Sequence, residues 1–424
     1  MFLLPRQASD PANSFARTET KTKILLLSAF FPSPAADSAG VLDAHYILRE
    51  LCRKHEVTLL SFASAEDRKH LPGLQTMCRE VVALDPPALP RSALYFLYTG
   101  LSFASQLPAI ARMSHSKPMV QALRQRIASG GFDLVHVEFT QMAHYVEFID
   151  GVPAILDESD IAFVRRERFA QTTDSRAARL LLNWDTRKLK EYEIRYGGRF
   201  QGILVRTDHD RQFLQSLVPG ARIEVFPPWV DLSFAGRVRE EPQEENLLFY
   251  GAMWRPANEQ AVSYFLKQIF PTIRVSNPAV KFSVLGSRPS ERLRRMQGEK
   301  VRVTGYAEDV APYYSRACVV VVPLLSGSGI KGKIVQALAC GKPVVTTSVG
   351  AEGIPGAERD GLFVRDDPQS FAECVRWLLE QRRYLGFREP ARQFVRRFYD
   401  WKAGVERLEN LYAEVSHSAR AACH

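Results

Sequence analysis

The feature that most constrains the fold of this chain is a repeated alternation of short, continuous apolar runs with longer amphipathic segments. The first such unit is KILLLSAF, then a Pro, Ala and Gly loop, then VLDAHYILRELCRKH and VTLLSF. Continuous apolar runs of this length are typical of strands that are buried on both faces, which occur in parallel sheets covered by helices. The first half of the chain predicts strands at 23–30, 57–62, 81–84, 133–139, 153–157, 202–207 and 223–227.

The same alternation starts again after residues 231–246, which are charged, poor in large apolar residues and typical of a linker. We therefore expect a mobile extension at 1–20, a first domain at 21–232, a linker at 233–246, a second domain at 247–395 and a closing helical segment at 396–424. Two α/β domains joined in this way imply a central cleft at the carboxyl ends of their strands, where ligands bind. The second domain predicts strands at 247–253, 280–287, 301–306, 318–325 and 343–348.

Composition excludes several classes of protein. The 424 residues are 46% hydrophobic and 24% charged, as in a globular protein and unlike a disordered or collagen-like chain. The net charge of +9 favours an anionic partner, such as a nucleotide, a phosphorylated substrate or an acidic lipid surface. Nucleic acid is not expected, because no recognisable binding module is present. The six cysteines are widely separated in the sequence: Cys52, Cys78, Cys318, Cys340, Cys374 and Cys423. We therefore expect neither a disulfide framework nor a zinc site. Secretion is not expected either, and the cysteine pattern fits a cytoplasmic location.

Two segments leave membrane contact open. Residues 93–111 carry no charge and predict a helix packed on the domain, a membrane-interface anchor or a true span, with Gly100 and Pro108 arguing against the span. Residues 161–200 carry ten Arg or Lys and five Asp or Glu, which indicates either a solvated face or contact with anionic lipid or a polyprenyl-phosphate acceptor. Peripheral association with the inner face of the plasma membrane is therefore an alternative to a purely cytoplasmic location.

The most informative stretch is 319–353, where a buried strand ends in a Gly and Ser loop and a helix follows from about Lys331. Free backbone N–H groups at a helix start, together with Lys331 and Lys333, predict a site for phosphate oxygens. Residues 327–333 also match the first seven positions of a Walker A loop, but Ile334 stands where Ser or Thr would hold magnesium. A nucleotide hydrolase is therefore disfavoured, and a merely structural Gly-rich turn stays possible for the segment in isolation.

The second half of the chain resembles the carboxyl-terminal domain of family 4 glycosyltransferases, which are retaining enzymes of the GT-B fold. The resemblance rests on LLFYGAMWRPANEQAVSYFLKQIFP, VRVTGYAEDVAPYYSRACVVVVPLL and GIKGKIVQALACGKPVVTTSVGAEGI in this order, over about 200 residues. The first half is similar to the acceptor domain of the family in PSPAADSAG, FDLVHVEF, RTDHDRQFL and PPWVD. The resemblance implies two Rossmann-like domains, the first binding the acceptor and the second the nucleotide-sugar donor, with the last helix crossing back to the first domain.

The family's donor loop carries two glutamates eight positions apart, and Ser328 and Gln336 stand at those positions here. Gln336 can still bond a ribose hydroxyl through its amide, whereas Ser328 is a shorter, neutral substitute. Some relatives use a GxGxxxK form of this loop, which Gly327, Gly329 and Lys333 fit. The resemblance thus implies donor contacts from this loop and its surroundings at Gly40, Asn258, Gly305, Tyr306, Gly327, Ser328, Gly329, Ile330, Gln336 and Glu352.

Breaking a sugar–phosphate bond builds negative charge on the departing diphosphate, so fixed donors and cations aimed at the phosphates lower the barrier. Lys331, Lys333 and the loop amides can supply them without a metal or other cofactor, with Arg255 as a further cation and Asn258 capping the helix that follows. Tyr306 either stacks on the base or is a core aromatic. Glu352 either contacts the donor sugar or lies in solvent.

On the acceptor side, Asp37 precedes the Gly40 loop, where backbone can approach the donor phosphates closely. His136 and Glu138 share one face at the end of a predicted strand, and Glu138 can take or orient the proton of the acceptor hydroxyl. Asp157 ends the next strand and suits binding of sugar hydroxyls.

The predicted function is retaining, metal-independent sugar transfer from a nucleotide-diphosphate sugar to a glycan or lipid-linked acceptor in cell-surface polysaccharide or glycoconjugate synthesis. A nucleotide-sugar 2-epimerase and a non-catalytic donor-binding partner are the alternatives.

Overall fold

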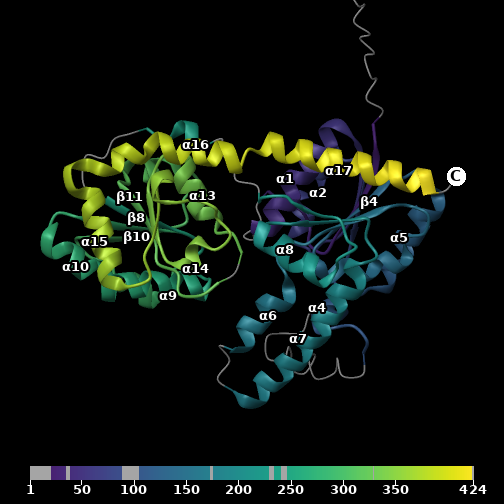
Figure 1. Ribbon diagram of the computed structural model, residues 1–424, viewed down its shortest axis with the longest axis horizontal. Helices are drawn as coiled ribbons and strands as arrows, with labels where there is room; N and C mark the ends of the chain where they lie inside the picture. Colours follow the sequence, from purple (N-terminus) through teal and green to yellow (C-terminus); the bar gives the residue numbers. More distant parts are fainter. Residues whose placement is uncertain are drawn as a thin grey trace, which may run out of the picture.

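The computed structural model describes residues 21–34, 39–87, 105–171, 175–228, 234–239, 246–327 and 329–422. The expected extension at 1–20, Asp37, Ser328, most of the uncharged segment at 93–111 and much of the linker lie outside the described residues. Figure 1 shows two α/β domains side by side, with the last helices running across both.

The first domain is built on a parallel sheet. Its described part has seven strands in the order β3-β2-β1-β4-β5-β6-β7, so each strand expected from the sequence is confirmed. The strands are β1 Lys23–Ser28, β2 Glu56–Phe62, β3 Glu80–Leu84, β4 Leu134–Glu138, β5 Ala154–Asp157, β6 Gly202–Val205 and β7 Ile223–Val225. Helical elements between them are α1 Ala39–Lys54, η1 Asp67–His70, α2 Leu71–Met77, α4 Ala109–Ser114, α5 Lys117–Ser129, η4 Thr140–Phe148, α6 Ala162–Gln171, α7 Arg176–Gly197 and α8 Asp208–Leu217.

The second domain is a second parallel sheet, with the strand order β10-β9-β8-β11-β12-β13 in the described part of the chain. The five expected strands are confirmed, but the sequence analysis missed β13, which has only three residues. The strands are β8 Asn246–Tyr250, β9 Lys281–Leu285, β10 Val301–Gly305, β11 Val319–Val322, β12 Val344–Thr346 and β13 Leu362–Val364. Helical elements up to the last strand are η5 Ala235–Arg237, α9 Pro256–Tyr264, η6 Phe265–Ile269, α10 Phe270–Ser276, α11 Glu291–Arg294, α12 Ala311–Arg316, α13 Gly332–Ala339, α14 Ser348–Ala351 and η7 Glu358–Asp360.

Strand burial explains why the apolar runs predict this architecture. Residues 24–28 of β1 and all four residues of β11 are buried, as expected for strands with helices on both faces. In the first domain, alternate residues of β4 enter different cores: Val135 and Val137 join one, and Leu134 joins the other. Both faces of the sheet are therefore covered.

The chain returns to the first domain through its last helices, after α15 Pro368–Leu379 and η8 Glu380–Phe387. Helix α16 Arg388–Phe398 packs in the core of the second domain through Phe394 and Val395. Helix α17 Trp401–Ala422 instead places Leu408, Leu411 and Tyr412 in the core of the first domain, beside residues of β1 and β4. Figure 1 shows the two helices in yellow along one side of the molecule, so the expected crossing is confirmed.

Helices α6 and α7 form a hairpin that projects from the body of the first domain (Figure 1). Its base contains two carboxyl groups that are both buried, Glu158 after β5 and Glu193 on α7. Glu193 accepts a hydrogen bond from the backbone N–H of Ala162 at the start of α6 (2.9 Å), and the Thr140 hydroxyl donates to Glu158 (3.1 Å). Burial raises the pKa of Glu158 to about 8 and that of Glu193 well above its usual range, and the two side chains are hydrogen-bonded to each other. We therefore expect this pair of carboxyls to keep a proton at neutral pH, which favours the contact between the hairpin and the sheet.

This proton makes stability depend on pH. Because the folded protein holds it more tightly than the unfolded chain, the free energy of unfolding should fall as pH rises from the usual carboxyl range to about 8. Glu158→Gln keeps a neutral donor facing Glu193, so we expect a melting temperature several degrees above that of the parent at pH 8.5 and little difference at pH 5. Glu147→Gln, which alters an exposed carboxylate paired with Arg199, is the control. If the melting temperatures of parent and Glu158→Gln changed equally with pH between 5 and 8.5, the shared proton would be contradicted.

Within the described residues, no helix is both long enough and apolar enough to cross a membrane. Of the uncharged segment at 93–111, the described end enters α4, where Ala109 and Ala111 are buried and the Ala109 N–H donates to Asp185 of α7 (2.9 Å). This end is packed on the first domain.

Candidate active site

The Gly-rich loop after β11 lies at the carboxyl edge of the second sheet. Gly327 and Gly329 have φ values of 134° and 70°, which side chains rarely adopt, so the glycines are required by the backbone. The loop ends at Lys331, which precedes α13 and whose ammonium donates to the Gly329 carbonyl (2.5 Å). The first turn of α13 thus directs its backbone N–H groups to the region of the loop.

Lys333 is the centre of the site. Its ammonium donates to Oδ1 of Asn258 on α9 (2.5 Å) and lies over the ring of Phe249 on β8 (4.8 Å). A Cβ atom at Gly251 would lie 2.7 Å from the same nitrogen, so only glycine leaves room for the lysine there. Three elements, α13, α9 and the end of β8, therefore hold this ammonium in place.

The site is short of negative charge. Burial, then the charges of Arg255 and Lys331, lower the pKa of Lys333 to about 7. The pKa of Lys331 is also lowered, mainly by burial, although Glu352 acts in the opposite direction. Cations that crowd one another in this way are stabilised by a bound anion, so the electrostatics favour a ligand with phosphate groups.

The residues of the GAMWRPAN turn differ in one respect from the expectation. Helix α9 begins at Pro256 with Arg255 at the N-cap, so Asn258 lies inside the first turn and does not cap the helix. Its amide instead donates to the Ala252 carbonyl (2.8 Å) while its oxygen accepts from Lys333. The cap prediction failed because the proline already starts the helix two residues earlier.

Trp254 belongs to the same turn and has two guanidinium groups over its ring, those of Arg255 (5.4 Å) and Arg288 (5.0 Å). A pocket of about 500 Å³ opens next to it on the outer face of α9. The Ser326 hydroxyl of the Gly-rich loop donates to Gln260 in its lining (3.4 Å). The pocket is lined by Trp254, Pro256, Glu259, Gln260, Ser263, Tyr264, Lys267, Gln268 and Arg292.

Gly305 and Tyr306 end β10 at the same edge of the sheet. Gly305 has a φ of 79°, and its carbonyl accepts from the Gly286 N–H (2.9 Å) at the end of β9. The Tyr306 side chain is 75% exposed. Tyr306 is therefore not a core aromatic, which was one of the two interpretations, and its ring is available to a ligand.

Glu352 and Gly353, after α14, are where the two domains touch. Glu352 accepts from Arg168 of α6 (2.6 Å), and its other oxygen lies 3.8 Å from Lys331. A Cβ atom at Gly353 would lie 2.6 Å from Thr207 of the first domain and 3.0 Å from Ile330 of the loop. The hairpin of the first domain is thus linked to the Gly-rich loop of the second, and Glu352 does not lie alone in solvent.

We expect Arg168→Glu to loosen this contact. The exposed pair contributes at most about 1 kcal/mol, so the amides of α6 should exchange with deuterium roughly two- to fivefold faster. The double variant Arg168→Glu, Glu352→Arg exchanges the charges of the pair and should bring the rate back toward that of the parent, although its new arginine also meets Lys331. Equal exchange in all three proteins would show that the pair does not hold the hairpin.

The expected acceptor residues form a different, buried group. His136 and Glu138 share a face of β4, as predicted, with Nε2 and Oε1 3.2 Å apart, and both side chains are inaccessible to solvent. Nδ1 of His136 lies 2.5 Å from the Tyr412 hydroxyl of α17. Burial, and then the charge of Asp157, raise the pKa of Glu138. Glu138 is thus the last residue of β4 and is buried there.

Asp157 completes this group. Both of its oxygens contact the guanidinium of Arg206 (2.9 and 3.1 Å), which also lies 3.7 Å from Asp43 of α1. In the described part of the chain, His136, Glu138 and Asp157 are the side chains spaced to hold a metal, with ligand atoms within 4.8 Å of one another. An ion there would compete with Arg206 for Asp157, so the guanidinium already supplies positive charge to this cluster.

The remaining predicted residues lie near these two groups. Gly40 starts α1, and a Cβ atom there would lie 3.3 Å from the Phe139 ring after β4. Gln336 is half-buried on α13, one turn after Lys333. Ile334 is fully buried in the core, so a hydroxyl at this position would not face the loop, which removes the basis of a Walker-type magnesium site.

The sequence analysis missed three residues that make contacts in these two groups: Arg168, Arg206 and Tyr412. Arg206 stood in the quoted RTDHDRQFL segment, and its place directly after an apolar strand was a usable signal. Tyr412 and Arg168 gave no such signal, because the partner of each lies far away in the sequence. Tyr412 and His136, for example, are 276 positions apart.

Comparison with known proteins finds relatives of the second domain. Residues 244–381 match the family model described as glycosyl transferases group 1. An uncharacterized 44.6 kDa protein in the cps region of Klebsiella pneumoniae is 27% identical over 139 residues, covering 31% of this chain and 36% of the relative. D-inositol 3-phosphate glycosyltransferase 1 of Catenulispora acidiphila is 35% identical over 131 residues, covering 29% and 30%. The matched segment spans about a third of these relatives.

Solved structures match the whole chain at low identity. Sucrose-phosphate synthase from Thermosynechococcus elongatus superposes with a TM-score of 0.65 at 15% identity, covering 94% of this chain and 100% of that chain. Anabaena HepE in complex with UDP has a TM-score of 0.62 at 14% identity, covering 93% and 100%. The chain therefore has the GT-B fold, and its residues 244–381 match the family model of group 1 glycosyl transferases.

Proposed function

We propose that the protein is a retaining, metal-independent glycosyltransferase that moves a sugar from a nucleotide-diphosphate sugar to a glycan or lipid-linked acceptor in cell-surface polysaccharide or glycoconjugate synthesis. The observation that carries the proposal is the position of the Lys333 ammonium, which Asn258 holds (2.5 Å) at the start of α13, beside the Gly-rich loop. Burial and the charges of Arg255 and Lys331 lower its pKa to about 7. A diphosphate supplies the negative charge that this group of cations is short of.

In the proposed reaction, the bond between the sugar and the diphosphate breaks while charge grows on the diphosphate oxygens. Lys331, Lys333 and the N–H groups of the loop stabilise that charge, and Arg255 adds to the field. Gln336 holds the ribose and Tyr306 covers the base, while Glu352 faces the sugar. Asn258 fixes the Lys333 ammonium, so the cation needs little rearrangement as the charge develops.

The nucleotide is proposed to be UDP, because HepE, a structural neighbour of the same fold, was solved with UDP and, in other crystals, with UDP and glucose or with UDP-glucose. Polysaccharide or glycoconjugate synthesis agrees with the cps region named for one relative of the second domain. These likenesses support the proposal and leave the donor sugar to experiment.

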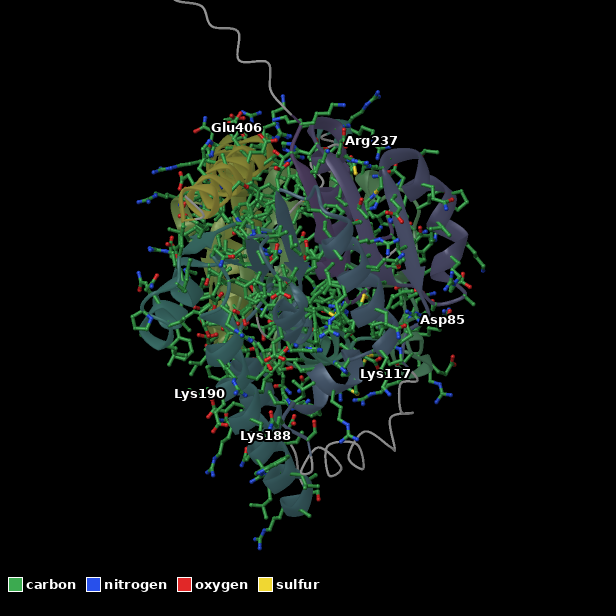
Figure 2. The ribbon with its side chains drawn as sticks, turned by 90° about the vertical axis from the view of Figure 1, so that its right-hand side faces the viewer. Asp85, Lys117, Lys188, Lys190, Arg237 and Glu406 are labelled. Atoms are coloured by element: carbon green, nitrogen blue, oxygen red, sulfur yellow. The ribbon has the colours of Figure 1, made fainter. Side chains whose placement is uncertain are left out.

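The acceptor is proposed to bind the first domain near Asp37, Gly40, His136, Glu138 and Asp157, with Glu138 taking or orienting the proton of its hydroxyl. Glu138 is buried with a raised pKa, so this role requires the acceptor to reach it through a local opening. The hairpin carries basic side chains on α7, among them Lys188 and Lys190, labelled in Figure 2. The positive charge of the hairpin supports peripheral contact with phosphate-bearing lipid acceptors or with the membrane. The proposed location is therefore cytoplasmic, with peripheral contact of this kind.

Calorimetry with UDP tests the donor site. We expect the purified protein to bind UDP equally well with EDTA and with added magnesium, because lysines and helix amides replace the metal. Loss of binding in EDTA would overturn metal independence, and absence of binding in both buffers would overturn the donor site. If UDP binds, analysis of products from UDP-sugars with and without acceptor separates transfer from 2-epimerisation and from binding without turnover.

A further inference from the structure

Two cysteine thiols of the first domain lie in contact although they are 26 positions apart. The sulfur atoms of Cys52 and Cys78 are 3.6 Å apart. Cys52 is in the last turn of α1, and Cys78 directly follows α2, where its N–H donates to the Leu74 carbonyl. This proximity is independent of the donor site in the second domain.

The two thiols differ in access. Cys52 is half-buried at the edge of the first-domain core, whereas Cys78 is only 8% exposed within it. The other described cysteines, Cys318, Cys340 and Cys374, are buried in the second domain, and burial raises the pKa of Cys340 to about 12 and that of Cys374 to about 11. An external reagent therefore meets Cys52 first among the described thiols, and Cys78 is the thiol beside it.

We propose that Cys52 and Cys78 are a thiol modification site that forms an intramolecular disulfide with a disulfide of the glutathione class as the oxidant. The thiolate of one of the two cysteines attacks one sulfur of the oxidant, forming a mixed disulfide and releasing one glutathione thiol. The thiolate of the other cysteine then attacks the protein sulfur of this mixed disulfide, and the second glutathione leaves. The protein loses two protons and two electrons, and the oxidant is reduced to two thiols.

The geometry requires a small movement. A disulfide needs its sulfur atoms about 2.0 Å apart, so the thiols must approach by roughly 1.6 Å. Cys78 has extended backbone angles (φ −86°, ψ 152°) and connects α2 to β3, so it is not held inside a helix. Rotation of its side chain, with a small shift of this connection, brings the sulfurs together while Cys52 stays on α1.

The bond would fasten α1 to the connection between α2 and β3 and close a loop that includes β2. Closing such a loop lowers the entropy of the unfolded chain and so stabilises the folded protein. Helix α1 begins beside Gly40 and ends at Lys54, which pairs with Glu409 of α17 (2.9 Å). Oxidation therefore strengthens the part of the first domain where its first and last helices meet.

The test uses the full chain, reduced and then incubated with a series of mixtures of oxidised and reduced glutathione. We expect the loss of two hydrogens in intact mass, a Cys52–Cys78 peptide pair in a non-reducing digest, and a melting temperature several degrees above that of the reduced protein. Cys374→Ser should behave as the parent does. Cys52→Ser and Cys78→Ser should each lack the peptide pair and the shift.

Peptide mapping of the unsubstituted chain decides the matter even if a cysteine variant folds poorly. A mixed disulfide with glutathione that persists on Cys52, or two thiols that remain open to alkylation at the most oxidising ratio, would overturn the proposal. So would an equal melting shift in Cys52→Ser.

Discussion

Lys333→Ala is expected to lower kcat for sugar transfer by roughly a hundredfold to a thousandfold, the effect of removing one preorganised donor from a developing negative charge. The ammonium is fixed by Asn258 and lies over the Phe249 ring before any ligand arrives, so its loss removes a group that needs no rearrangement. Steady-state kinetics with the donor and acceptor identified by product analysis gives the number.

Two variants make this result interpretable. Gln336→Ala removes a proposed ribose contact that is present before the reaction as well as during it, so it should raise KM more than it lowers kcat. Lys402→Ala removes an exposed lysine at the start of α17 and should leave both constants unchanged. A folded Lys333→Ala protein that transfers sugar at the parent rate would remove the basis of the proposed mechanism.

A second large effect is expected from pH. Because the Lys333 pKa is lowered to about 7 in the free protein, a bound diphosphate should raise it and take up a proton above neutral pH. The dissociation constant for UDP should then rise by up to about tenfold per pH unit between about pH 8 and pH 9.5. Calorimetry in two buffers of different ionisation enthalpy measures the proton uptake directly.

Lys333→Arg is the control for this dependence, since a guanidinium stays charged throughout the range. Its UDP affinity should vary far less with pH than that of the parent, whatever its absolute value. The lowered Lys333 pKa should also add a contribution to the stability of the free parent that grows from about pH 7 toward the usual lysine pKa, because the unfolded chain then binds more protons at this lysine than the folded one. Below about pH 8 this contribution opposes the loss of stability from Glu158. Equal pH dependence in parent and Lys333→Arg would show that another group takes up the proton.

The parts of the fold that follow from local pattern could be predicted from the sequence. Strands such as β1 and β11 are continuous apolar runs whose burial on both faces is encoded by neighbouring residues. The Gly-rich loop was recognisable because Gly327 and Gly329 mark backbone that other residues rarely adopt. Strand β13 escaped because three residues, the last of them partly exposed, carry too little pattern.

Contacts between distant residues could not be predicted in this way. Asn258 followed a proline and looked like a cap, but its partner is Lys333, 75 residues later. Glu158 and Glu193 each look like ordinary surface carboxylates in the sequence, and only the packing of α7 against the end of β5 buries them together. The interpretation of Glu138 as an accessible base likewise depends on how far α17 covers β4.

The return of α17 to the first domain also has a consequence for how the protein is made. Leu408, Leu411 and Tyr412 complete a core whose other members, such as Ile24 and Leu134, are synthesised hundreds of residues earlier. Domains generally fold as units while the chain emerges from the ribosome. Here one apolar face of the first domain stays uncovered until the second domain and α17 have been translated. The second domain can therefore fold first, although it comes later in the chain.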